Sequence, residues 1–401
     1  MKKKLFSMIS LLLALAMVFS IAAFAGNETS PPYKAHLAFK PDGKFKILQI
    51  SDIQEGYIMM PIVKDFLRDI VPATAPDLIV LTGDNFGGYY AKSGIKPLDR
   101  ILVKQAIDNY MSIFEAYGIP VAMVYGNHDA ESTIGKREQM EIYNSYSNSI
   151  SHDEVNSPRN SYGTYNIPIY ESKKSNKIAF NIWMIDSNMY DEVNGGYDHV
   201  YQEQIDWYVN KSNALKEANG GVPVPSLMFQ HIIVPEIFDA LLEVPAGTPG
   251  AIGKNGKSYV LNPENTKSGV LHEGPCPPTF NNGQFDAVLG QGDVLAMAFG
   301  HDHVNSFVVE HKGIDLIATP GVNFQSYGDR GRGVRLFTLD KSDLSTYEQE
   351  LITYDDLYDN EVDALRFTMY GSENGVPNMI LAAVQYLFRR YFFLFASPKL
   401  R

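Results

Sequence analysis

Cysteine is almost absent from this chain of 401 residues, in which Cys276 is the only one. A single cysteine cannot form an intrachain disulfide, so the sequence excludes a small fold that is held together by disulfide bonds. Cys276 lies between prolines, with no adjacent base, and we interpret it as incidental to catalysis. Stability must therefore come from a sizeable apolar core, which 45% hydrophobic residues can supply.

A positive balance of charge is also missing. The chain has 46 Asp and Glu residues against 34 Lys and Arg, and its formal net charge is −12. Because an acidic protein repels polyanions, we expect no nucleic-acid partner. The same charge does not exclude a phosphate-bearing substrate, since bound metal cations would set the local field at a site.

The first 25 residues have the pattern of a secretory signal peptide. Three lysines at positions 2 to 4 precede an apolar run from Leu11 to Phe24, which ends in the small-x-small sequence Ala23-Phe24-Ala25. This pattern predicts a cleaved signal peptide over residues 1–25, and hence a secreted or cell-surface protein. An uncleaved membrane anchor is the alternative interpretation.

Three further regions are expected after the signal peptide. Residues 26–43 are polar and predict a tether, residues 44–344 predict the folded domain, and residues 345–401 predict a C-terminal extension. Within the extension, residues 380–395 are apolar and aromatic, with Gln385, Arg389 and Arg390 on one side of a helical wheel. The stretch is too short to span a bilayer. It predicts either a terminal helix packed on the body or an interfacial helix that makes peripheral membrane contact.

Strand-like and helix-like patterns alternate along the first part of the domain. Strands are predicted at 45–50, 77–81 and 120–125, and helices at 61–71 and 97–117. This alternation predicts an α/β fold with a parallel sheet. The later pattern predicts a hairpin at 162–170 and 177–185, a helix at 202–218, and strands at 225–229 and 295–299. Residues 244–283 are rich in Gly, Pro, Asn and Ser, as in long loops that cap binding sites.

Six short segments carry the residues suited to chemistry. They are Ser51-Asp52-Ile53-Gln54, Gly83-Asp84-Asn85, Gly126-Asn127-His128-Asp129, Gln230-His231, Gly300-His301-Asp302-His303 and Arg332-Gly333. The first five place Asp, Asn, Gln and His side chains just after apolar, β-rich runs. Divalent metals of hard and borderline character take oxygen and nitrogen ligands of this kind. Taken singly, a Gly-Asp pair also suits a turn or helix cap, and a lone histidine after a strand is more often structural.

The order D-x-(H/Q), GD, GNHD, H, GHxH resembles that of the calcineurin-like metallophosphoesterases. Over residues 44–340 the chain is similar to the purple-acid-phosphatase-like branch that lacks the metal-binding tyrosine, because Gly87 stands three residues after Asp84. The resemblance implies an α/β fold in which a two-sheet sandwich is flanked by helices in four layers. It also implies a dinuclear metal centre at the carboxyl edge of the sheets.

The family pattern implies a role for each residue of these motifs. Asp52, Gln54, Asp84 and His303 would hold the first metal, and Asp84, Asn127, His231 and His301 the second. The resemblance implies two divalent ions, of Mn, Fe, Zn, Mg or Ca, and attack on phosphorus by a metal-activated hydroxide. His128, oriented by Asp129, would protonate the leaving group. Asn127, His128 and Arg332 would contact a small phosphorylated substrate.

Gln54 departs from the family pattern, in which most members have histidine. An amide oxygen is a weaker and harder ligand than imidazole, so we expect the first site to bind weakly or to prefer Mn, Mg, Ca or Fe over Zn. The leading prediction is a secreted phosphoesterase that hydrolyses phosphate mono- or diesters. Two alternatives remain: a non-catalytic or single-metal binding protein with a decayed first site, and a surface-associated protein whose important part is the C-terminal helix.

Overall fold

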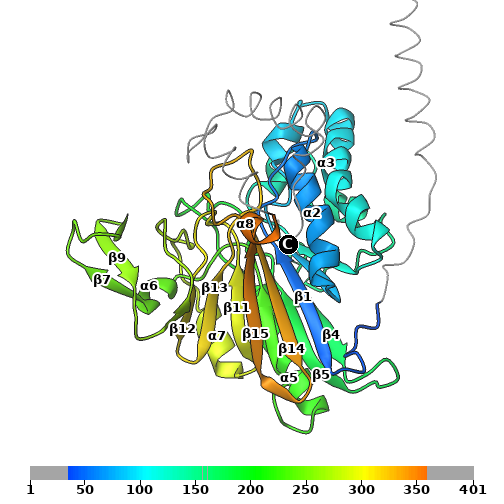
Figure 1. Ribbon diagram of the computed structural model, residues 1–401, viewed down its shortest axis with the longest axis vertical. Coiled ribbons are helices and arrows are strands. Elements are labelled where there is room, and N and C mark those ends of the chain that lie inside the picture. Colours follow the sequence, from blue (N-terminus) through cyan, green and yellow to red (C-terminus); the bar gives the residue numbers. More distant parts are fainter. Residues whose placement is uncertain (1–34, 156, 160, 359–401) are drawn as a thin grey trace, which may run out of the picture. The chain divides into compact units, whose positions relative to one another are not determined.

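The computed structural model describes residues 35–155, 157–159 and 161–358 (Figure 1). The signal peptide predicted at 1–25 and the amphipathic segment predicted at 380–395 lie outside the described residues. Within these ranges, no helix combines the length and the apolar character needed to cross a membrane.

A five-stranded sheet is built from the two ends of the described chain. Its order is β15-β14-β1-β2-β3, with β1, β2 and β3 parallel and β14 and β15 antiparallel to their neighbours. The strands are β1 (Lys44–Ile50), β2 (Leu78–Thr82), β3 (Val121–Val124), β14 (Gly333–Asp340) and β15 (Asp343–Thr353). The helices nearest in sequence are α2 (Pro61–Thr74), α3 (Lys96–Ala116) and α4 (Lys136–Tyr143), with short turns η1 (Gly88–Ala91) and η2 (Asp129–Glu131).

A seven-stranded sheet is formed by the middle of the chain. Its order is β10-β12-β13-β11-β6-β5-β4, and the inner strands β13, β11, β6 and β5 are parallel. The strands are β4 (Tyr165–Tyr170), β5 (Ile178–Met184), β6 (Ser226–Phe229), β10 (Thr266–Ser268), β11 (Val294–Phe299), β12 (Val308–His311) and β13 (Ile314–Ala318). Helices α5 (Gln202–Ala218) and α7 (Gln284–Gln291) belong to this half.

The strand residues alternate between apolar layers, because successive side chains of a strand point to opposite faces. In β1, Ile47 belongs to the core between the two sheets, whereas Leu48 belongs to the core under α2 and α3. In β6, Leu227 faces the core between the sheets and Met228 faces a third core with residues of α5 and α7. One core lies between the five-stranded sheet and α2 and α3, one lies between the two sheets, and one lies between the seven-stranded sheet and α5 and α7. These layers confirm the predicted four-layer α/β sandwich.

The segment predicted as a long loop at 244–283 contains strands. β7 (Leu241–Val244), β8 (Ile252–Lys254) and β9 (Lys257–Leu261) pair antiparallel in a small third sheet next to α6 (Ile237–Ala240). Figure 1 shows β7 and β9 projecting beside the seven-stranded sheet. The Gly- and Pro-rich composition indicates the turns between these strands. The strands themselves are too short for an alternation of apolar and polar residues to be recognised in the sequence.

Both predicted limits of the domain are wrong. Leu37 and Phe39 of the predicted tether are buried in the core between the sheets, so the fold begins before residue 44. At the other end, position 344 lies inside β15, which pairs with β14 along most of its length. Tyr354, in α8 (Tyr354–Leu357), is buried and stacks on Phe66 of α2, so the fold continues through at least residue 358.

Candidate metal centre

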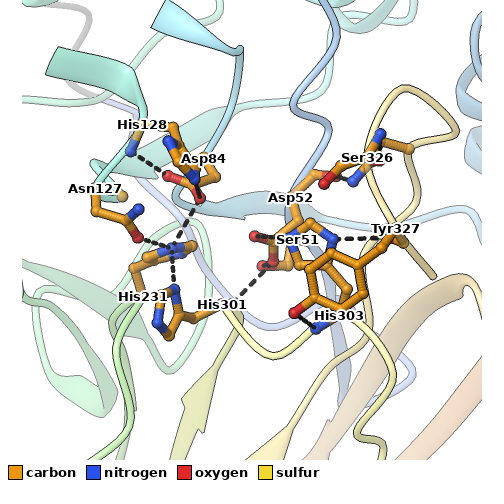
Figure 2. Close-up of polar contacts among 12 residues, drawn as sticks. Ser51, Asp52, Asp84, Asn127, His128, His231, His301, His303, Ser326 and Tyr327 are labelled. Atoms are coloured by element: carbon orange, nitrogen blue, oxygen red, sulfur yellow. Dashed lines mark hydrogen bonds and ion pairs between the residues drawn. The ribbon is translucent and has the colours of Figure 1, made fainter. Parts of the chain in front are cut away.

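The carboxyl ends of strands from both sheets supply the predicted ligands. β1, β2 and β3 end just before Asp52, Asp84 and Asn127, and β6 and β11 end just before His231, His301 and His303. Figure 2 shows these side chains turned toward one another, with Asp84, Asn127, His231 and His301 on one side and Asp52 and His303 on the other. The structure thus brings the motif residues from five strands together, as open α/β sheets do with ligands at their carboxyl edge.

The glycines of the motifs permit this close approach. A Cβ atom at Gly126 would collide with the backbone and carboxylate of Asp84, and one at Gly300 would collide with the Ser51 side chain. Asp52, Asp84 and His301 adopt φ values of 50°, 47° and 74°, in the left-handed region that side chains other than glycine seldom occupy. Strained backbone of this kind persists where the surroundings hold it and concentrates at functional sites.

His231 Nε2 lies at the centre of the first cluster. It is 3.3 Å from Asp84 Oδ2, 3.2 Å from Asn127 Oδ1 and 3.2 Å from His301 Nδ1. These four atoms are two oxygens and two ring nitrogens, and all four side chains are buried. They form one donor set around one small volume.

Backbone carbonyls fix the imidazole tautomers. His231 Nδ1 is 2.9 Å from the Thr82 carbonyl oxygen, and His303 Nδ1 is 3.0 Å from the Tyr327 carbonyl oxygen. A carbonyl can only accept, so Nδ1 carries a proton in both rings, and in the neutral ring Nε2 presents a lone pair. This outer contact is the usual one behind a metal-binding histidine.

The second cluster contains Asp52 and His303. Asp52 Oδ2 accepts hydrogen bonds from the Ser51 hydroxyl (2.5 Å) and the His301 backbone N–H (3.0 Å). Asp52 Oδ1 lies 3.4 Å from His303 Nε2. Asp52 Oδ1 and the Gln54 amide oxygen are both buried, and neither has a hydrogen-bond partner among the described residues.

The residues present fit a pair of divalent cations. Buried acceptors without a hydrogen donor cost free energy unless a partner satisfies them, and among the described residues Asp52 Oδ1, Gln54 Oε1 and His301 Nε2 are buried atoms of the site without a hydrogen-bond partner. Asp84, His231 and His301 alone offer three ligand atoms close enough together to share an ion. Two other groups in the described chain meet the same distance criterion: Cys276, His301 and Asp302, and Asp191, Asp198 and His199.

Carboxyl and imidazole groups are concentrated in this site, and they shift one another's pKa values. Burial lowers the pKa of His231, but the Asp84 and Asp52 carboxylates outweigh burial and raise it to about 10. Burial of the Asp84 carboxyl raises its pKa, and His231 and His128 outweigh this and hold the pKa well below its usual range. Burial and the neighbouring His231 lower the pKa of His301 to about 3. The site therefore favours charged carboxylates facing a cation.

The prediction that Asp129 orients His128 is wrong. Both Asp129 oxygens accept backbone N–H groups, from Asn85 at 3.0 Å and from Gly126 at 2.7 Å. The carboxylate beside the His128 ring belongs to Glu131, whose Oε2 is 2.7 Å from Nδ1. The reason is local: the short turn η2 carries Asp129 under the strand ends and returns Glu131, three residues after His128, to the ring.

Arg332 binds the loop beside the site, and its predicted contact with substrate stays a prediction. Its Nε and Nη1 donate to the backbone carbonyls of Asn323 (2.6 Å) and Asp329 (2.8 Å), and its guanidinium lies over the Phe324 ring. These contacts fold the loop that precedes β14, in which Asn323 Nδ2 donates to the Asp52 carbonyl at 2.7 Å. Arg332 supports the site from behind.

Sequence reasoning missed Tyr190, which borders the site. Its hydroxyl oxygen accepts from Asn127 Nδ2 at 3.0 Å and its O–H donates to Glu131 at 2.9 Å. The bond to Asn127 leaves the amide oxygen of that residue facing His231. A tyrosine in a loop 63 positions from its partner carries no motif, whereas the i, i+3 spacing of His128 and Glu131 in a turn was a usable signal.

Comparisons with known proteins agree with the site. The sequence model of the family described as "Calcineurin-like phosphoesterase" matches residues 45–305. The chain is 29% identical to "Probable inactive purple acid phosphatase 29" of Arabidopsis thaliana, over 76% of this chain and 79% of that one. It is also 29% identical to "Probable inactive purple acid phosphatase 14" of the same plant, over 74% and 75%. It is 24% identical to "Phosphatase DCR2" of Saccharomyces cerevisiae, over 77% of this chain and 51% of that protein.

The family model covers well over half of the chain, and the strand ends that it spans carry all the predicted metal ligands. The chain belongs to the calcineurin-like phosphoesterase family.

Proposed function

We propose that this protein hydrolyses phosphate mono- or diesters of small substrates with the help of two divalent cations. The observation that carries the proposal is the donor set around His231 Nε2, in which Asp84, Asn127 and His301 present acceptor atoms within 3.3 Å of that nitrogen. A neutral His231 presents the lone pair of Nε2 toward the oxygens of Asp84 and Asn127, and a cation would satisfy these acceptors together.

Each ligand has a proposed place. Asp52, Gln54, Asp84 and His303 would hold one ion, and Asp84, Asn127, His231 and His301 would hold the other. When bound, such ions would supply positive charge that stabilises the phosphoryl oxygens. They would also lower the pKa of a water, so that it loses a proton and can attack phosphorus. The identity of the ions is open among Mn, Fe, Zn, Mg and Ca, and the amide oxygen of Gln54 favours the harder ions of this set.

His128 supplies the proton for the leaving group in this proposal. Its side chain is 29% exposed, in contrast to the buried Asp84 beside it, so the ring faces the open side of the centre. Its backbone N–H donates to Asp84 Oδ1 at 2.7 Å, which ties the position of the ring to a metal-binding carboxylate. A histidine placed in this way can act as a general acid. Asn127 would contact the substrate from the same loop.

A second function has support from Gln54 and from the names of the relatives. Both Arabidopsis proteins are called probable inactive phosphatases, and Gln54 replaces the imidazole that the family pattern has in the first site. A protein that binds one ion and has no hydrolytic activity would have both features.

Activity on two model esters separates the two functions. Purified protein is assayed on p-nitrophenyl phosphate and bis-p-nitrophenyl phosphate with each divalent metal, and bound metal is counted per chain. The proposal expects hydrolysis that chelation removes, two ions per chain, and a loss of roughly 100-fold or more in Asp84→Asn. Asp343→Asn, an exposed carboxylate on β15, is the matched control and keeps full activity. One ion per chain without hydrolysis would establish the binding protein instead.

Export is proposed from sequence alone. The lysines at positions 2 to 4, the apolar run after them and Ala23-Phe24-Ala25 support cleavage after residue 25. N-terminal sequencing of the protein recovered from the producing cells tests this, and an intact Met1 would contradict it. Peripheral membrane contact through residues 380–395 is likewise a proposal, tested by liposome sedimentation of the full chain against a chain that ends at residue 375.

A further inference from the structure

We propose that Glu131 is the positioning residue for His128, and that Tyr190 couples Glu131 to the metal-binding side chain of Asn127. The inference rests on the proposed phosphoesterase function and deepens it. It assigns the orientation of the proton donor to a carboxylate outside the GNHD motif, which ends at Asp129.

The contact between Glu131 and His128 fixes one nitrogen of the ring. Glu131 Oε2 is 2.7 Å from His128 Nδ1, and a carboxylate can only accept, so Nδ1 carries a proton. The other nitrogen, Nε2, lies 4.0 Å from Asp84 Oδ2 and thus faces the metal centre. The Tyr89 ring and the imidazole make a T-shaped contact, with ring centroids 5.4 Å apart. The ring is held by a hydrogen bond and an aromatic contact, with Nε2 directed at the place where a leaving oxygen would lie.

The second oxygen of Glu131 extends the contact to the metal centre. Tyr190 donates its hydroxyl to Glu131 Oε1 at 2.9 Å, and the same hydroxyl oxygen accepts from Asn127 Nδ2 at 3.0 Å. With its amide nitrogen committed to Tyr190, Asn127 can only present Oδ1 to His231, at 3.2 Å. One carboxylate therefore orients the proton donor and, through one tyrosine, a ligand.

Glu131 is the nearby carboxylate whose oxygens are available to His128 and Tyr190. Asp129, the motif residue, uses both oxygens on backbone N–H groups of the loops after β2 and β3. Asp84 accepts the backbone N–H of His128 through Oδ1 and lies against His231 through Oδ2. Glu131 is 25% exposed and His128 is 29% exposed, so the pair borders the accessible side of the site.

The chemical step places one proton. As the bond between phosphorus and the leaving oxygen breaks, its electron pair remains on that oxygen. The N–H bond of His128 Nε2 breaks and an O–H bond to the leaving oxygen forms, so the alcohol leaves neutral. His128 keeps the proton on Nδ1, hydrogen-bonded to Glu131, and regains the Nε2 proton from solvent. Poor leaving groups need this proton, whereas p-nitrophenolate leaves without it.

Kinetics on two esters test the proposal. Glu131→Gln, which keeps the shape and removes the charge, is expected to lower kcat on phenyl phosphate by about 10- to 100-fold and on p-nitrophenyl phosphate by less than about 3-fold, with KM nearly unchanged. Tyr190→Phe is expected to lower kcat in the same direction by about 3-fold. Glu243→Gln, an exposed glutamate on β7, is the matched control and changes neither rate. Equal losses on both esters, or a change in KM alone, would overturn the proposal.

Nitrogen NMR of the zinc-loaded full chain gives a test that does not depend on activity. At a pH where the ring is neutral, His128 is expected to carry its proton on Nδ1, and Glu131→Leu is expected to move it to Nε2. The resonance is assigned from its loss in His128→Gln. An Nε2 proton in the unmodified protein, or an unchanged tautomer in Glu131→Leu, would overturn the inference. If neither ester is hydrolysed with any metal, the proposed function fails, and the tautomer still decides the orientation of His128.

Discussion

Lys136 and Asp186 form a buried ion pair just behind the centre, and its removal should destabilise the protein strongly. Lys136 Nζ donates to both carboxylate oxygens of Asp186, at 2.8 and 2.7 Å, and both side chains are 1% exposed or less. The pair joins the start of α4, which follows η2, to the end of β5 in the other sheet. The perturbation is Lys136→Met, which keeps the apolar stem and removes the charge.

The size of the effect follows from what Asp186 would retain. Without Lys136, its carboxylate keeps backbone N–H donors from Tyr162 at 2.9 Å and Asn188 at 3.1 Å but no cation. Breaking a buried ion pair at one partner costs about 3–5 kcal/mol, because an uncompensated charge stays buried. At roughly 2 °C per kcal/mol for a large domain, the Tm should fall by about 6–10 °C.

Calorimetry of the variants measures this loss. Lys136→Met/Asp186→Asn should lose less than Lys136→Met alone, because the neutral amide removes the buried charge and keeps an acceptor. Lys177→Met, which breaks an exposed pair with Glu171, is the control and should leave the Tm within about 2 °C of the parent. A Tm for Lys136→Met within about 2 °C of the parent, or losses that simply add in the double variant, would refute the reasoning.

Three other predictions concern the metal centre. Gln54→His should keep the fold and tighten zinc binding relative to manganese, since imidazole is the better zinc ligand; identical affinities for both metals in titrations of both proteins would mean that Gln54 is no ligand. His128→Ala should lower kcat on phenyl phosphate far more than on p-nitrophenyl phosphate at unchanged metal content, and an equal loss would contradict its role as an acid. The raised pKa of His231, about 10, stabilises the metal-free fold below its unfolded value near 6.5, and this contribution is lost as pH rises toward 10. Metal binding requires the neutral ring, so it should release protons at neutral pH and tighten as pH rises; calorimetry in buffers of different ionisation enthalpy measures the release, and no buffer dependence would contradict it.

The fold could be predicted from the sequence where the spacing of apolar residues and the polar motifs indicated the same strand. The sequence predicts the strands that precede Asp52, Asp84, Asn127 and His231 to within about a residue or two, because each is rich in apolar residues and is followed by a polar turn. The ends of the domain were mispredicted for a physical reason. Leu37 and Phe39 are two buried residues in a short stretch that follows polar residues, and β15 is half-exposed with mixed side chains, so neither segment has the apolar pattern of an inner strand.

The residues of the candidate site could be predicted from the sequence, but the contacts that support them could not. Figure 2 shows six of the seven predicted ligands together at the carboxyl edges of the sheets, and the backbone N–H of the seventh, Gln54, donates to the Asp84 carbonyl at 2.8 Å. The partners of the ligands depend on backbone geometry that a sequence does not reveal. Thr82 and Tyr327 act through carbonyl groups, Asp129 binds backbone N–H groups, and Glu131 reaches His128 only because of the turn that η2 makes.

Anomalous diffraction from crystals grown with manganese tests the central claim most directly. We expect two peaks in each chain, roughly 3.5–4 Å apart. One should contact Asp52, Gln54 and His303, the other should contact Asn127, His231 and His301, and Asp84 should lie between them. A single peak at this centre, or a peak at Asp191, Asp198 and His199 with none here, would contradict it.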